Sequence, residues 1–64
     1  MWLSIFMSHE KDNIVRITNM LSEHNILTKV ICRSQNPDFY EVFVTQAEFR
    51  EAQALIVDDE LFIF

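Results

Sequence analysis

Two histidine–carboxylate pairs are the residues of this chain best suited to bind a metal ion. His9 precedes Glu10, and Glu23 precedes His24. A protein metal site needs three or four converging ligands, and these pairs lie at opposite ends of one predicted helix, about 20 Å apart. We therefore expect solvated side chains and no metal site. A helix C-terminus favours positive charge, which is a sufficient structural reason for His24.

Three other groups of reactive residues also have simpler explanations. Cys32 has no histidine or cluster of cations near it in sequence, and it falls on the core-facing side of a predicted strand, so we expect a buried, inert thiol. The run Asp58–Glu60 lacks a glycine-containing calcium loop and is expected to be solvated. Arg33, Gln35 and Asn36 belong to a turn whose composition already explains them. The sequence thus predicts no catalytic residues and no cofactor, so it does not favour an enzyme.

Composition narrows the class of protein further. The 64 residues carry a net charge of −5 and include one cysteine and no glycine. The charge disfavours binding to nucleic acid, and the lack of glycine excludes a glycine-rich phosphate loop. No apolar run reaches the roughly 20 residues that span a bilayer. A single cysteine cannot form an internal disulfide and fits a reducing, cytoplasmic location.

The small size of the chain favours self-association. We predict one domain over residues 1–64, and a domain this short buries only about 60% of its unfolded surface. Without disulfides or metal, oligomerisation is the remaining source of stability. We expect a homo-oligomer, with a dimer as the simplest form.

The elements follow from periodicity and from the residues that begin and end helices. Strands are predicted at Trp2–Met7, Ile26–Cys32 and Tyr40–Val44, with helices before Asn25 and between Thr45 and Val57. Asn25 is the best non-glycine residue for a left-handed helix end. Thr45 and Glu48 have the spacing of a capping box. The order is βαββα, with Leu61–Phe64 as a possible fourth strand, which indicates an α+β, ferredoxin-like fold whose two helices cover one face of an antiparallel sheet.

Strand alternation then predicts an apolar second face of the sheet. The residues assigned to the helix-covered core are Leu3, Ile5, Met7, Ile26, Val30, Cys32, Val42 and Val44. In the third strand, Phe39, Glu41 and Phe43 alternate with the core residues Val42 and Val44 and so belong to the other face. The residues expected to form an interface on the open face are Trp2, Phe6, Leu27, Ile31 and Phe43, with Phe62 and Phe64. An open face of this kind marks an interaction surface. A register slip of one residue in one strand would scramble the patch.

Three segments carry a resemblance to a known family. They are LSEHNI (Leu21–Ile26), the β-branched second strand, and YEVFVTQAEFREAQALI (Tyr40–Ile56). Together they resemble the small bacterial signal-transducing protein domains, whose ferredoxin-like fold is related to the nitrogen-regulatory PII class. The resemblance implies fold and assembly more than activity. Asn25 stands where that family usually has glycine, and no nucleotide-binding loop is matched.

Two functions remain open at this point. The first is a non-catalytic assembly or regulatory module that contacts itself or another protein through the open sheet face. The alternative is a small-ligand sensor of the amino-acid-binding ACT type, whose ligand loop would contain Ser8, His9 and Asp12. An RNA-binding sheet with Phe6 and Phe43 as stacking residues is disfavoured by the acidic charge and the missing basic strip.

Overall fold

A computed structural model describes residues 1–34 and 37–59 of the chain. The elements in chain order are β1 (Trp2–Ser8), α1 (Lys11–Glu23), β2 (Thr28–Arg33), β3 (Phe39–Thr45), a 3₁₀ turn (Gln46–Glu48) and α2 (Phe49–Val57). This order and its antiparallel sheet confirm the predicted α+β fold of ferredoxin-like type. The possible strand at Leu61–Phe64, with Phe62 and Phe64, lies outside the described residues.

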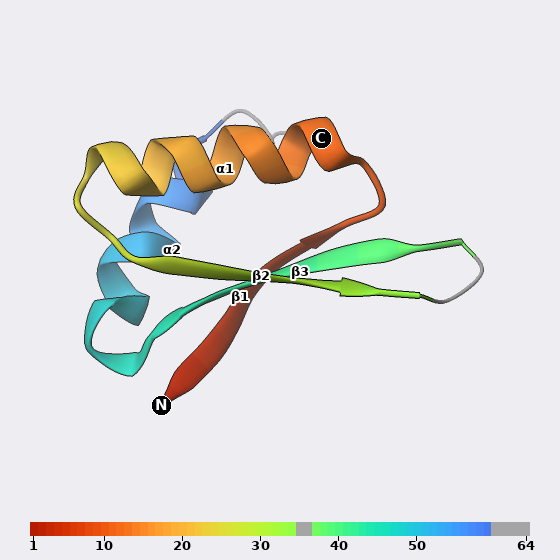
Figure 1. Ribbon diagram of the computed structural model, residues 1–64. Coiled ribbons are helices and arrows are strands. Elements are labelled where there is room, and N and C mark those ends of the chain that lie inside the picture. The colour runs from red at the N-terminus through yellow and green to blue at the C-terminus, as the bar shows by residue number, and fades with distance from the viewer. Residues whose placement is uncertain (35–36, 60–64) are drawn as a thin grey trace.

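The described sheet has three strands in the order β1-β3-β2. The central strand β3 is antiparallel to both neighbours, so β1 and β2 run parallel to each other and α1 is the crossover between them (Figure 1). Among the described residues, β2 is paired with β3 only and lies at an edge of the sheet. In the same part of the chain, neither helix is long and apolar enough to cross a membrane.

The core is small and aliphatic. Its buried residues are Ile14, Ile17 and Leu21 of α1, Ala52 and Ile56 of α2, Val42 and Val44 of β3, and Ile26. Both helices therefore pack on the one face of β3 that carries the two valines. No aromatic side chain of the described residues is fully buried; Phe6 and Phe49 only border the core.

The end of α1 forms as predicted around Asn25. This residue has φ of 61°, the left-handed conformation, and its N–H donates to the Ser22 carbonyl at 2.9 Å. The Ile26 N–H donates to the Leu21 carbonyl, also at 2.9 Å, which completes a Schellman motif. His24 is the C-cap residue, and its Nδ1–H donates to the Met20 carbonyl at 3.0 Å, which satisfies one of the last carbonyl groups of α1.

The start of the second helix differs from the predicted capping box. The Thr45 hydroxyl donates to the Glu48 carboxylate at 3.1 Å, and no side chain caps the backbone at Thr45. A 3₁₀ turn occupies Gln46–Glu48, and α2 begins only at Phe49. Thr45 and Glu48 do interact, but their contact lies across the 3₁₀ turn and does not cap the helix backbone. The predicted helix end at Val57 is confirmed.

A β-bulge in β1 corrects the predicted face assignment. Ser4 is opposite Phe43, yet Phe6 is opposite Val42, so one extra residue is accommodated between Ser4 and Phe6. The prediction that Phe6 lies on the open face is therefore wrong, because the bulge turns it toward the helices, where it packs against the core beside Ile5. Met7, predicted to be in the core, is instead 59% exposed.

The predicted burial of Cys32 is also wrong. The register places its side chain on the same side of the sheet as Val30 and Val42, as expected. The thiol is nevertheless exposed, and Val30 beside it is 44% exposed. The helices leave Val30 and Cys32 of this edge strand uncovered, so alternation alone overestimated the burial of these two residues.

Candidate functional site: the uncovered face of the sheet

The side of the sheet opposite the helices carries a mixed apolar and charged surface, here called the open face. The open face consists of the β3 residues that alternate with the buried valines, together with the residues of β1 and β2 that pair with them or lie on the same side. Its members are Trp2, Ser4 and Met7 on β1, Phe39, Glu41, Phe43 and Thr45 on β3, and Lys29, Ile31 and Arg33 on β2.

Three of the predicted interface residues lie on this face. Trp2, Ile31 and Phe43 occupy it by their pairing register, and Trp2 is 39% exposed. Leu27 precedes β2 and is 64% exposed. Phe6 lies on the other side, for the reason given above.

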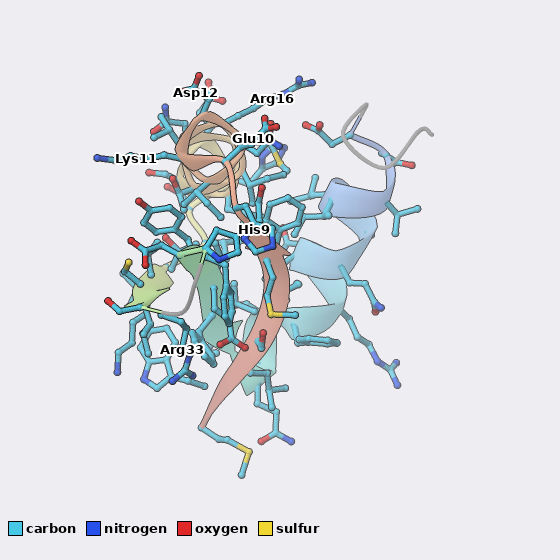
Figure 2. All side chains as sticks on the ribbon, turned by 90° about the vertical axis from the view of Figure 1, so that its right-hand side faces the viewer. His9, Glu10, Lys11, Asp12, Arg16 and Arg33 are labelled. Atoms are coloured by element: carbon cyan, nitrogen blue, oxygen red, sulfur yellow. The ribbon has the colours of Figure 1, made fainter. Side chains whose placement is uncertain are left out.

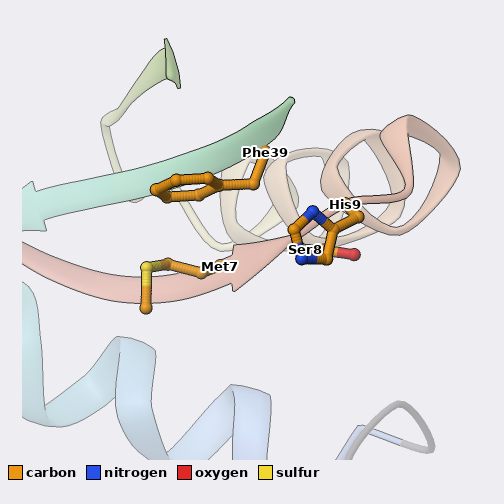
Figure 3. Close-up of a pocket in the computed structure, with 4 residues that line it drawn as sticks. All are labelled: Met7, Ser8, His9 and Phe39. Carbon is orange, nitrogen blue, oxygen red and sulfur yellow. The ribbon is translucent and has the colours of Figure 1, made fainter. Parts of the chain in front are cut away.

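Two residues of the open face, Met7 and Phe39, were not among the interface residues predicted from the sequence. Met7 was assigned to the core, because strict alternation along β1 carries no signal for the bulge. Phe39 was placed on this face by its alternation with Glu41 and Phe43, but it was not counted in the interface. The two side chains extend from neighbouring strands and line the same pocket (Figure 3).

A polar network crosses the middle of the open face. Arg33 contacts the Glu41 carboxylate through both Nε and a terminal nitrogen, each at 3.1 Å. The Ser4 hydroxyl hydrogen-bonds to the same carboxylate and is the main cause that lowers the pKa of Glu41, with Arg33 adding to the effect against partial desolvation. The three side chains come from three different strands, so the network fixes their positions on one face.

A second contact joins the outer strands at the Trp2 end. The Lys29 Nζ lies 5.8 Å from the centre of the Trp2 ring, within the range of a cation–π interaction. The open face thus carries two cations, Lys29 and Arg33, and one anion, Glu41, although the chain as a whole has a net charge of −5. Its charge balance is opposite to that of the rest of the molecule.

An open pocket of about 320 Å³ occupies the other end of this face, lined by Met7, Ser8, His9 and Phe39 (Figure 3). The His9 ring meets the Phe39 ring edge-on, with centroids 6.0 Å apart. Its Nδ1 is 3.0 Å from the Asp38 carbonyl oxygen. Because a carbonyl oxygen only accepts, Nδ1 carries the hydrogen, and this fixes the ring orientation.

The structure brings only part of the predicted ligand loop together. Ser8 and His9 line the pocket, but Ser8 Oγ already accepts from the Glu10 N–H at 3.0 Å and from the Asn13 amide at 3.4 Å. Asp12 is exposed and points away from the sheet (Figure 2). Arg16 forms an ion pair with Asp59 at 3.2 Å, which joins α1 to the residues after α2.

The two histidine–carboxylate pairs lie apart at the two ends of α1. Within residues 1–34 and 37–59, no three His, Cys, Asp or Glu side chains are grouped in a way that would hold a metal ion.

Comparison with known proteins gives no further assignment. Neither the models of protein families, nor the curated proteins, nor the solved structures contain a match to this chain.

Proposed function

We propose that this protein is a non-catalytic assembly or regulatory module that pairs with a second copy of itself through the open face. The observation that carries the proposal is the distribution of aromatic side chains. The buried core is entirely aliphatic, while Trp2, Phe39 and Phe43 lie on the face that no described helix covers. Covering these three aromatic side chains would remove their exposed apolar surface from water.

Energetic considerations support a second copy as the occupant. Aromatic anchors at the centre of an interface commonly contribute at least about 2 kcal/mol each. A second copy also supplies the apolar burial that a chain of 64 residues lacks by itself. The resemblance to bacterial signal-transducing domains agrees with a regulatory role in the cytoplasm, exerted through protein contacts and without catalysis.

The mass of the protein in solution tests the proposal. Light scattering at micromolar concentration should give the mass of a dimer. Phe43→Glu should give a monomer, because the interface loses an aromatic ring and the new carboxylate would have to be desolvated there. Circular dichroism of this variant should confirm that it remains folded.

A charge change on the helix surface is the matched control. Glu51→Lys alters an exposed position of α2 and should keep the dimer mass, at a cost below about 1 kcal/mol in stability. A wild-type protein that scatters as a monomer, with Trp2 fully accessible to iodide quenching, contradicts the proposal.

The pocket at His9 favours one second candidate, the small-ligand sensor. Ser8 and His9 of the predicted ligand loop line this pocket, and its size lies at the lower end for small-molecule sites, about 300 Å³. Thermal unfolding in the presence of a metabolite panel tests the sensor, because a ligand that binds only the folded state raises the melting temperature. A specific shift at low ligand concentration, lost in His9→Ala, would favour the sensor over the assembly module.

A further inference from the structure

The open face is arranged in rows that run across the strands. In order from the Trp2 end, the rows are Trp2–Thr45, then Ser4–Phe43–Lys29, then Met7–Glu41–Ile31, and finally Phe39–Arg33 with His9 against Phe39. The bulge lies between the second and third rows, and it is what brings Met7 onto this face. The first row therefore holds a partly exposed aromatic ring, and the last row holds a pocket.

The two ends of the face carry groups that can pack against each other. Trp2 is exposed at one end, and the pocket at the other has walls made by the Phe39 ring, the Met7 thioether and the His9 imidazole. Aromatic and thioether groups make favourable contacts with an indole ring. Within one chain these ends cannot meet, since seven residues of extended strand separate Trp2 from His9 by about 20 Å.

We propose that two copies pair face to face with their β1 strands antiparallel, so that Trp2 of each copy fills the pocket of the partner between Met7, His9 and Phe39. This rests on the self-association proposed above and specifies its geometry. A two-fold axis that crosses the strands between the Ser4 row and the Met7 row exchanges the first row with the last. Sheets packed in this way lie about 10 Å apart, with strands inclined by about 30°.

The charges of the open face favour this axis over a two-fold axis that runs along β3. The proposed axis places the Lys29 row over the row that holds the partner's Glu41, so opposite charges approach each other. A two-fold axis along β3 would instead place Glu41 directly over the partner's Glu41 and leave Trp2 outside the pocket. Like charges in direct opposition at an interface are unfavourable.

Nuclear Overhauser effects between two differently labelled copies test the geometry without any mutation. Trp2 is the only tryptophan, so its indole signals are unambiguous. In an equimolar mixture of ¹³C-labelled and unlabelled protein, intermolecular cross-peaks should join the Trp2 indole to the His9 and Phe39 rings and to the Met7 methyl group. In addition, Trp2→Ala should weaken the dimer at least tenfold, whereas Val57→Ala on the exposed surface of α2 should leave its affinity unchanged.

The outcomes separate this geometry from self-association itself. A dimer whose intermolecular cross-peaks join Phe43 to Phe43, with none from Trp2 to the pocket, overturns the docking and leaves the pairing of the open faces in place. A dimer that survives Phe43→Glu places the interface elsewhere and overturns both. A monomer at millimolar concentration also overturns both.

Discussion

Cys32 is exposed on the edge strand, on the side of the sheet that faces away from the proposed interface. We therefore expect the native protein to react with a thiol reagent at a rate close to that of a free thiol, whether or not it is dimeric. Cys32→Ser should change the free energy of unfolding by no more than about 0.5 kcal/mol, as is usual for surface substitutions. Protection of native Cys32 from the reagent would contradict the exposed position.

Glu41 makes the stability of the folded state depend on pH. The lowered pKa of Glu41 means that the folded state favours its carboxylate form, through Ser4 and Arg33. Its contribution to stability is therefore complete above its unfolded pKa, near 4.5, and is lost as the pH falls through the lower folded pKa. The difference in unfolding free energy between the wild type and Glu41→Gln should be constant above about pH 5.5 and shrink below 4.5.

Arg33→Gln is the companion measurement for this network. Because Ser4 and Arg33 both lower the pKa of Glu41, Arg33→Gln and Ser4→Ala should each keep part of the pH dependence. Equal pH dependence of wild type and Glu41→Gln would show that another carboxylate dominates the acid transition.

The C-terminal end of α1 allows a test of the left-handed conformation of Asn25. Asn25→Gly should be neutral or stabilising by up to about 1 kcal/mol, because glycine adopts positive φ without the clash of a Cβ, although it also gains freedom in the unfolded chain. Asn25→Ala should be destabilising by about 1 kcal/mol, because alanine keeps the Cβ and lacks the local hydrogen bonding of asparagine. Urea unfolding of both variants measures the difference. A loss with glycine larger than that with alanine would contradict the left-handed helix end.

The elements were predictable from local chemistry, but the exact register of β1 was not. The apolar spacing of Ile14, Ile17 and Leu21 and the position of Asn25 determine α1 within the chain itself. The bulge depends on how β1 pairs with a strand more than thirty residues away, so alternation within β1 contains no signal for it. For this reason Trp2 and Phe43 of the candidate site were predictable, whereas Met7 was not and Phe6 was misplaced.

The molecule as a whole combines an aliphatic buried core with three aromatic side chains, Trp2, Phe39 and Phe43, on its open face. Its extents of 32 × 29 × 17 Å describe a flattened shape, in which a sheet carries one layer of helices (Figure 1). A second copy on the open face would make the sheet an inner layer, with helices on both outer surfaces. The pocket residues Met7 and Phe39 would then contact Trp2 of the second copy, which they cannot reach within their own chain.

The edge position of β2 has a consequence for the size of the assemblies. An edge strand exposes unpaired backbone groups that can recruit further strands, and natural proteins often oppose this with charged side chains. Lys29 and Arg33 carry such charges along β2. Edge-to-edge growth from β2 is therefore unfavourable. Replacing both cations by threonine should therefore raise the binding of a fibril-specific dye in concentrated solutions, because the charges that oppose growth from this edge are removed.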